Sequence, residues 1–218
     1  MAIVLASASP RRKELMGLIT QNFEVLPLAV KEDGVKGSTP ARLAQKLSEL
    51  KCRAGALRRP YDVVIGCDTV VEYNERVFGK PANEEDARVM LSTLQGHTHK
   101  VHTGVCVFYD GSETEFVCTT YVSFLPMSNE EIDAYIATGE PMDKAGAYGI
   151  QGAASKFIDG VQGDYFNVVG LPVSRLYHLL QGLGVLETTA AAVPQTEAEA
   201  ETTEPTAPQA DTVPAGGE

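Results

Sequence analysis

A turn near the N-terminus carries the first residues that could do chemistry. The segment SASPRR, residues 7–12, follows four apolar residues that are typical of a short buried strand and precedes a helical pattern. Ser9 can cap that helix and Pro10 fits its first position, so Arg11 and Arg12 lie in the first turn. Because a helix N-terminus carries positive partial charge, two arginines there favour a bound phosphate or other polyanion. A solvated basic turn is the alternative that these residues leave open.

Carboxylates form the second group of candidates. Asp68 lies inside the nearly continuous apolar run Val63–Val71, and a carboxylate buried there must be hydrogen-bonded, paired or bound to a metal. An aspartate that caps the turn after a strand is the structural alternative. Glu32 and Asp33 form another acidic site, and a hard divalent cation uses one or two such carboxylates with phosphate oxygens and waters. Composition alone favours a solvated acidic loop for that pair.

Two lysines stand out by their positions. Lys51 lies at the edge of a helical stripe and Lys80 lies in a Gly-Lys-Pro turn. Lys144 is a weaker candidate, since ordinary surface lysines outnumber catalytic ones. The three histidines of HTHKVH, residues 97–102, are not expected to bind zinc, because the third faces away from the first two on a strand.

Three common catalytic motifs are absent from the sequence. It contains no G-x-x-x-x-G-K-[ST] loop, no G-x-G-x-x-G after a strand and no G-x-S-x-G elbow. These absences disfavour a Walker-type ATPase, a Rossmann dehydrogenase and an α/β-hydrolase.

The elements that must position the candidates alternate between strands and helices. Thr39 and Pro40 begin a helix, and its apolar residues recur at helical spacing to predict one core stripe: Leu43, Leu47, Leu50 and Ala54. Asn83 begins a helix that reaches Leu94. The run Val63–Val71 suits a central strand covered on both faces.

The second half of the chain predicts a hairpin, a helix and a long irregular segment. Residues 101–109 and 116–124 are strands joined by the turn DGSE, and Ser128 with Glu131 forms a capping box. Residues 140–170 are glycine-rich, yet their aromatic and aliphatic side chains favour an ordered functional loop. A last amphipathic helix carries Leu176 and Leu180. We therefore predict an α/β domain over residues 1–186, with a mixed twisted sheet and helices on both faces.

The C-terminal tail differs from this domain in composition. The 218 residues carry a net charge of −11, and residues 187–218 hold seven acids and no Lys or Arg, which leaves −4 for the rest. The tail is rich in Ala, Thr, Pro and Glu, so it cannot bury enough apolar surface to offset its ordering entropy. We expect it to be disordered.

The sequence also limits the cellular compartment and the partners that we expect. The sequence has no secretory leader pattern and no apolar run as long as a membrane span, so we expect a cytoplasmic protein without membrane contact. The four cysteines lie far apart, which predicts reduced core residues. A mildly acidic body without a basic stripe disfavours nucleic-acid polymers as partners.

Five segments, in this order and spacing, resemble the Maf family of nucleoside triphosphate pyrophosphatases: LASASPRRKEL, GCDTVV, GKP, TGEPMDKAGAYGIQG and GDYFNVVGLPV. The resemblance covers residues 3–183 and leaves out only the tail. It implies a Maf/Ham1 (ITPase-like) fold with a deep central cleft. It also implies hydrolysis of a nucleoside triphosphate between its α- and β-phosphates, to the monophosphate and pyrophosphate, with Mg²⁺ or Mn²⁺.

The resemblance also assigns roles to residues. In this family the aspartate that matches Asp68 is the proton acceptor, and the positions of Arg11, Thr69 and Gln151 mark substrate choice. DTV and AYGIQG are similar to the branch that acts on dTTP and UTP, and a sister branch that acts on 7-methyl-GTP carries different residues there. The metal would be held by Glu32 and Asp68.

Together these inferences predict one site. The triphosphate would be bound by one serine and four cationic side chains: Ser7, Arg11, Arg12, Lys51 and Lys80. The two lysines are also predicted to be catalytic. Asp68 would orient or deprotonate the attacking water next to the metal, and Thr69 and Gln151 would read the base.

The sequence departs from the family pattern at two positions, and two alternative functions stay open. Lys51 stands between Leu50 and Cys52 where many relatives read E-K-A, and Lys31 precedes Glu32 where an apolar residue is more usual. A nucleotide-binding regulator of septum formation without turnover is one alternative, and a pyrophosphatase for 7-methyl-GTP or modified bases is the other. A homodimer is expected by analogy alone.

Overall fold

A seven-stranded sheet organises residues 1–186, the part of the chain that this computed structural model describes. The strand order is β2-β1-β3-β5-β6-β7, and β4 pairs with β3 on the same edge as β1. β1 runs parallel to β2 and β3, whereas the other neighbouring strands are antiparallel. The predicted mixed sheet is thus confirmed. The tail 187–218, which we predict to be disordered, lies outside the described residues.

The elements have the following bounds. The strands are β1 Ile3–Leu5, β2 Glu24–Val25, β3 Val63–Tyr73, β4 Arg76–Phe78, β5 Thr98–Tyr109, β6 Ser112–Phe124 and β7 Ile158–Gln162. The α-helices are α1 Pro10–Gly17, α2 Pro40–Ala56, α3 Glu84–Leu94, α4 Asn129–Ile136, α5 Tyr165–Val169 and α6 Val173–Gly182. Three 3₁₀-helices, η1 Glu140–Asp143, η2 Ala145–Ala147 and η3 Ala153–Phe157, interrupt the segment between α4 and β7.

The helices begin where cap residues predict. The hydroxyls of Ser9 and Thr39 accept from backbone N–H groups three residues on, and Pro10 and Pro40 occupy the first helical positions. Asn83 caps α3, and the capping box of Ser128 opens α4. Because each cap satisfies backbone donors that a helix start leaves unpaired, these local contacts fix where α1 to α4 begin.

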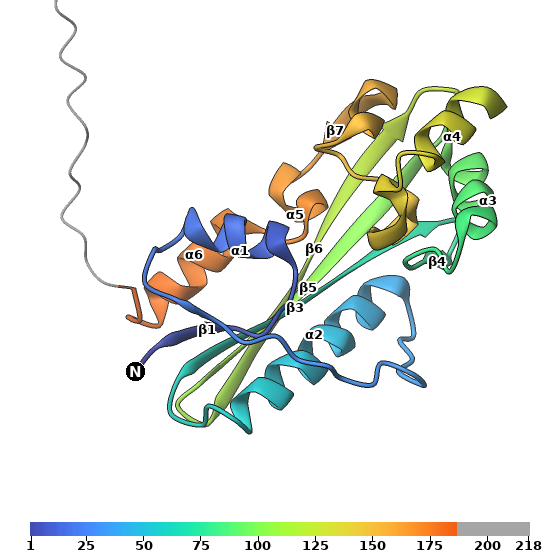
Figure 1. The fold of residues 1–218 in the computed structure, drawn as a ribbon. Coiled ribbons are helices and arrows are strands. Elements are labelled where there is room, and N and C mark those ends of the chain that lie inside the picture. The colour runs from blue at the N-terminus through green and yellow to red at the C-terminus, as the bar shows by residue number, and fades with distance from the viewer. Residues whose placement is uncertain (187–218) are drawn as a thin grey trace, which may run out of the picture. The chain divides into compact units, whose positions relative to one another are not determined.

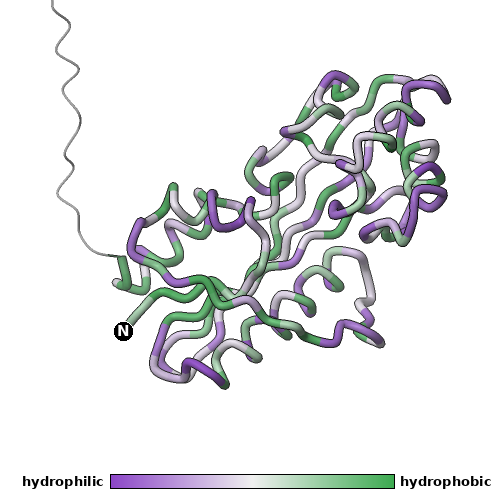
Figure 2. Tube along the Cα trace, viewed as in Figure 1, coloured by the Kyte–Doolittle hydropathy of each residue, from purple (hydrophilic) through white to green (hydrophobic). Residues whose placement is uncertain are grey.

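Helices cover both faces of the sheet, as predicted (Figure 1). α2 lies on one face, and α1, α5 and α6 lie on the other. The core under α1 and α6 joins strand residues such as Leu5 and Ile65 to Met16 and Leu180. A second large core packs α3 and α4 at the far end of the sheet. In Figure 2 the green of hydrophobic residues gathers along β1 and its neighbouring strands, while the strand-connecting loops at that end are purple.

α2 lies unusually close to its face of the sheet, because two glycines face it. A Cβ at Gly104 would lie 2.4 Å from the backbone oxygen of Ala44, and one at Gly66 would lie 2.4 Å from the backbone nitrogen of Cys52. Apart from Leu47, the residues that α2 buries are small or lie outside the predicted stripe: Ala44, Gln45, Ser48, Cys52 and Gly55. Of the predicted stripe only Leu47 is buried, whereas Leu43, Leu50 and Ala54 are half-buried.

Gly104→Ala is expected to lower the free energy of unfolding by about 1–3 kcal/mol, because the added methyl meets backbone atoms that cannot yield. Urea unfolding followed by circular dichroism measures the change. Gly182→Ala is the matched control, since no atom lies within 4 Å of its added Cβ at the end of α6. Equal stability of the two variants would contradict the close helix–sheet contact.

The edge of β3 that carries β1 and β4 has a gap. β1 pairs with β3 as far as Ile65, and β4 pairs with it from Val71 onward. Between these points no other strand of residues 1–186 pairs with this edge. Asp68 and Thr69 lie in the gap, so the fold itself opens the sheet at the predicted site.

The hairpin and the irregular segment extend the predicted elements. β5 and β6 are longer than predicted and meet at a two-residue turn of Asp110 and Gly111, both with positive φ. Residues 140–170 are ordered, as predicted, but contain β7 and α5 among the 3₁₀-helices. The sequence patterns missed β2, β4 and β7, which are short strands. Within residues 1–186 no helix has both the length and the apolar character that crossing a bilayer requires.

Candidate active site

A cleft of about 940 Å³ opens at the gap in β3. It is large enough for a nucleotide, since ligand pockets usually measure about 300–1,000 Å³. Its walls come from segments far apart in the sequence: the turn before α1, α2, β3, β4 and the segment 140–152. The structure brings all nine predicted site residues to this one cleft: Ser7, Arg11, Arg12, Glu32, Lys51, Asp68, Thr69, Lys80 and Gln151.

Arg12 is held firmly from both sides of its guanidinium. Its Nε donates to the backbone oxygen of Gly170 at 2.8 Å, and its Nη2 donates to Thr69 Oγ1 at 3.0 Å. Its Nη1 lies 3.5 Å from Ser7 Oγ, on the strand-to-helix turn. Because Gly170 follows α5 and Thr69 belongs to β3, these contacts fix the Arg12 guanidinium in the cleft wall. They do not neutralise its positive charge, since both acceptors are uncharged.

A chain of hydroxyls sets the orientation of Thr69. Thr103 Oγ1 donates to the backbone oxygen of Asn167 at 2.9 Å, so it accepts from Thr69 Oγ1, also 2.9 Å away. Thr69 has only one hydroxyl proton, and Thr103 receives it. Toward the cleft Thr69 therefore presents an acceptor, next to its hydrogen bond from Arg12.

Asp68 is buried and paired with a lysine. Lys51 of α2 donates to Asp68 Oδ1, and the same ammonium lies 2.9 Å from Glu32 Oε1. The side chains of Lys51 and Asp68 are 15% and 12% exposed, whereas that of Glu32 is 48% exposed. The carboxylates of Asp68 and Glu32 thus both contact the Lys51 ammonium at the floor of the cleft. The close approach of α2 at Gly66 and Gly104 places Lys51 within reach of Asp68.

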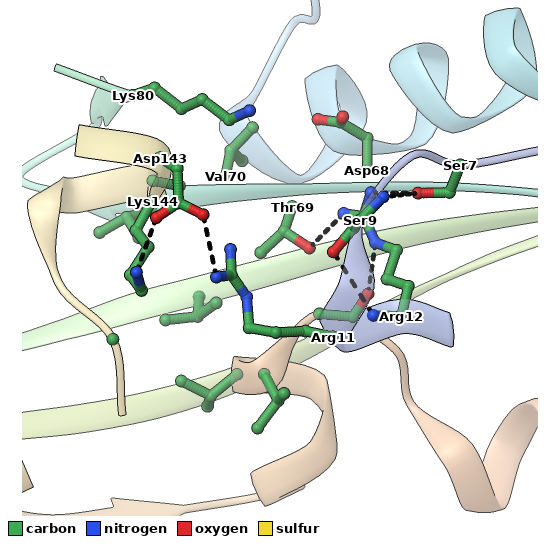
Figure 3. Close-up of a pocket in the computed structure, with 18 of the residues that line it drawn as sticks. Ser7, Ser9, Arg11, Arg12, Asp68, Thr69, Val70, Lys80, Asp143 and Lys144 are labelled. Carbon is green, nitrogen blue, oxygen red and sulfur yellow. Dashed lines mark hydrogen bonds and ion pairs between the residues drawn. The ribbon is translucent and has the colours of Figure 1, made fainter. Parts of the chain in front are cut away.

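The edge of β3 separates the site residues into two groups (Figure 3). Asp68 and Lys80 lie on one side of the strand, and Thr69, Arg11 and Arg12 lie on the other. For Asp68 and Thr69 this follows from the strand period, because successive side chains of β3 point to opposite faces. A ligand that contacts both groups must wrap around the open edge of β3.

The remaining cations differ in what they already bind. Lys80 is exposed and has no hydrogen-bond or ion-pair partner within residues 1–186, so it is available to an anion. Arg11 reaches across the cleft to Asp143, with Nη1 3.2 Å from Oδ2. Burial acts to raise the pKa of Asp143, but the hydrogen bond from Lys144 and the charge of Arg11 outweigh it and lower that pKa.

Two acidic residues of the cleft were missed in the sequence. Glu140 and Asp143 both line it, from η1. They belong to the segment GEPMDK of the family resemblance, yet nothing in their residue types distinguishes them from solvated loop acids. Lys144, a weaker sequence candidate, also lines the cleft and contacts both of them.

Neither the cysteines nor the histidines form a reactive centre here. Burial raises the pKa of Cys67 to about 12, so this neighbour of Asp68 stays a thiol. His99 contacts Tyr148, whereas His102 contacts Glu72, and burial lowers the pKa of His99 to about 4. All four cysteines are free. No group of three or more His, Cys, Asp or Glu side chains in the described part of the chain could by itself hold a metal ion.

One part of the cleft wall is apolar. Valines from β3, β5 and α5, with Tyr148, line it: Val71, Val101, Val168 and Val169. The cleft therefore combines a polar part rich in cations with an apolar part, as binding of a phosphorylated group attached to a flat ring would require.

Comparisons with known proteins agree with this geometry. The family model described as Maf-like protein matches residues 2–183. A dTTP/UTP pyrophosphatase from Koribacter versatilis (strain Ellin345) is 50% identical over 186 residues, which cover 85% of this chain and 96% of that protein. A dTTP/UTP pyrophosphatase from Geobacillus sp. (strain WCH70) is 47% identical over 84% of this chain and 98% of that protein.

A solved structure, that of the Staphylococcus aureus Ham1 protein, aligns with 83% of this chain and 98% of its own, at a TM-score of 0.46 and 17% identity. The family match spans nearly all of residues 1–186, and the two curated relatives match over almost their whole length. With the cleft residues of its five sequence segments gathered in one place, the chain belongs to the Maf family.

Proposed function

We propose that this protein hydrolyses dTTP and UTP to the monophosphate and pyrophosphate. The observation that carries the proposal is the pairing of a buried acid, Asp68, with a cleft that gathers Arg11, Arg12, Lys51 and Lys80. Curated relatives at 45–50% identity are named dTTP/UTP pyrophosphatases, which supports the same substrates for this chain.

The cations would bind the triphosphate and stabilise the charge that moves during phosphoryl transfer. Phosphoryl transfer depends mainly on positioning and charge stabilisation, so no covalent intermediate is required. Arg12 is already oriented by Gly170 and Thr69, and Lys80 has no competing partner in the described structure. Arg11 would exchange Asp143 for a phosphate oxygen. The Ser7 hydroxyl and the free N–H groups at the start of α1 would assist.

Asp68 would hold the attacking water and accept its proton. Its carboxylate lies at the floor of the cleft and is oriented by the Lys51 ammonium. A general base must lie within hydrogen-bond reach of the proton that it removes, and a rigid ion pair keeps it there.

The residues present fit a divalent cation, Mg²⁺ or Mn²⁺, as part of this proposal. Glu32 and Asp68 supply two hard oxygen ligands that already converge on one positive group, the Lys51 ammonium. Mg²⁺ commonly binds through one or two carboxylates, with waters and substrate phosphates completing its shell. When bound, such an ion lowers the pKa of a water and neutralises phosphate charge.

Glu32→Gln is expected to raise the Mg²⁺ concentration needed for half-maximal activity by at least about tenfold, since even outer-sphere partners change metal affinity by about 10–100-fold. A Mg²⁺ titration of dTTP hydrolysis measures the shift. Asp33→Asn, next to it on the same exposed loop, is the control and should titrate like the wild type. A Glu32→Gln curve that overlays the wild type would remove Glu32 from the metal site.

Thr69 and Gln151 would read the base. The proton of Thr69 is committed to Thr103, so Thr69 can accept a hydrogen bond but not donate one. Thymine and uracil carry a ring N–H where cytosine has an acceptor, so this polarity favours the first two. Gln151, an exposed residue of the cleft lining, offers both a donor and an acceptor.

The proposal is tested by pyrophosphate release from dTTP, UTP, CTP, GTP and 7-methyl-GTP, with Mg²⁺ or Mn²⁺, and by identification of the nucleoside monophosphate. Turnover of dTTP and UTP above the others supports it. Binding of dTTP without turnover would instead favour the nucleotide-binding regulator, and preference for 7-methyl-GTP would favour the sister branch. The cytoplasmic location and the homodimer stay predictions.

A further inference from the structure

The loop Gly149–Gly152 carries Gln151 on the rim of the cleft but gives it no side-chain support. Gln151 is exposed, and its side chain has no hydrogen-bond partner among residues 1–186. Its position therefore depends on the backbone of the loop, so whatever holds that backbone controls where the amide group points.

One carboxylate, that of Glu140, holds both ends of this loop. At the far end, Glu140 Oε2 accepts from the backbone N–H of Ala153 at 2.9 Å. At the near end the link passes through Tyr135 of α4, whose hydroxyl donates to Glu140 Oε1 at 2.8 Å and accepts from the N–H of Gly149 at 3.1 Å. Tyr135 is 3% exposed, and burial raises the pKa of its hydroxyl, which keeps the proton that it donates.

The loop also fits closely around Glu140. A Cβ at Gly152 would lie 2.0 Å from Glu140 Oε1, and a Cβ at Gly149 would lie 2.6 Å from Lys144 Cε. Lys144 in turn donates to the backbone oxygen of Glu140 at 2.7 Å. A side chain at either glycine would displace the end of the Glu140 or Lys144 side chain, so the loop backbone packs directly against both.

We propose that Glu140, acting through Tyr135, is a positioning residue that sets base selectivity by fixing the loop that presents Gln151. This rests on the proposed function, because it concerns which nucleoside triphosphate the cleft prefers. Glu140 and Asp68 both line the cleft, but no described hydrogen bond or ion pair joins the two side chains, so loss of Glu140 should affect recognition more than the chemical step.

The test compares Glu140→Gln and Tyr135→Phe with the wild type on UTP, dTTP and CTP. In Glu140→Gln one of the two acceptor oxygens is replaced by an NH2 group, which donates but cannot accept, so one end of the loop is released. We expect KM for UTP to rise about tenfold and the UTP-to-CTP ratio of kcat/KM to fall by a similar factor, with kcat within about twofold. Tyr135→Phe breaks only the Gly149 end and should shift both quantities in the same direction.

A second readout does not depend on turnover. Hydrogen exchange of the backbone amides of Gly149 and Ala153, followed by mass spectrometry, should become faster in Glu140→Gln. Glu85→Gln, an exposed change on α3, is the matched control and should alter neither exchange nor selectivity.

The outcomes separate this inference from the proposed function. If the wild type hydrolyses no triphosphate, the proposed function fails, and amide exchange alone decides whether Glu140 holds the loop. If the wild type is active and Glu140→Gln lowers the melting temperature but leaves the UTP-to-CTP ratio unchanged, Glu140 has only a structural role and the inference is overturned. If Glu140→Gln does not fold, an unchanged ratio in Tyr135→Phe overturns it equally.

Discussion

Asp68→Asn is expected to lower kcat for dTTP and UTP by about 10²–10⁴-fold, the usual cost of removing a general base. The amide keeps the shape of the side chain and can still accept from Lys51, but it cannot take a proton from water. KM should change much less, since the cations that bind the triphosphate remain. Steady-state pyrophosphate release at saturating Mg²⁺ measures both constants.

Asp159→Asn is the control for this change, because Asp159 is exposed on β7 and does not line the cleft. Its activity should match that of the wild type. A loss of less than about tenfold in Asp68→Asn would assign proton transfer to another group. Since Asp68 is buried beside Lys51, thermal unfolding of the variant must also be measured, so that a folding defect is not read as a catalytic one.

Arg12→Lys is expected to lower kcat/KM for dTTP by about 10²–10³-fold, although it preserves the positive charge. The guanidinium of Arg12 meets Gly170, Thr69 and Ser7 with three different nitrogens, and an ammonium cannot reproduce this planar fork. The loss should appear with every triphosphate, because Arg12 is proposed to contact the phosphates rather than the base.

The matched control is Arg58→Lys, in the exposed turn after α2, where no ion pair of the described structure involves the side chain. An Arg12→Lys variant that retains more than about a tenth of the wild-type kcat/KM would show that charge alone, and not the fixed fork, is what the substrate needs.

The starts of helices could be predicted from sequence because their determinants are local. Ser9 with Pro10, Thr39 with Pro40, and Ser128 with Glu131 each act within three or four residues, so neighbouring residues suffice to identify them. β2, β4 and β7 were missed because they are short and mostly exposed, so they lack the apolar run that identified the buried β1, and it is pairing with β1, β3 and β6 that defines them.

The buried face of α2 was predicted only in part, for a long-range reason. Its leucines form an apolar stripe, but the helix turns its smallest residues toward the sheet, because Gly66 and Gly104 allow backbone to approach backbone. Those glycines lie on two strands remote from the helix in sequence. No pattern within α2 could indicate them.

The candidate residues were found singly, and their partners were not. A charge in an apolar run identified Asp68, but only the fold shows that Lys51 and Glu32 meet there. Arg11 and Arg12 are adjacent in sequence, yet one contacts Asp143 and the other Thr69. Glu140 gave no signal, because its carboxylate contacts a backbone N–H group and a tyrosine hydroxyl, and sequence patterns show neither contact.

The gap in β3 is an open sheet edge, and such edges bear on strand-to-strand aggregation. An unpaired strand edge exposes backbone donors and acceptors, and in other proteins such edges recruit strands from neighbouring molecules and begin aggregation. Here only residues 66–70 are unpaired, which is about the length of one short strand. β1 and β4 close the gap at its two ends, and residues of α1 and α2 wall the cleft that opens there. The open edge is therefore short and paired at both ends, which leaves it accessible to a small ligand and limits the hazard that a longer edge would bring.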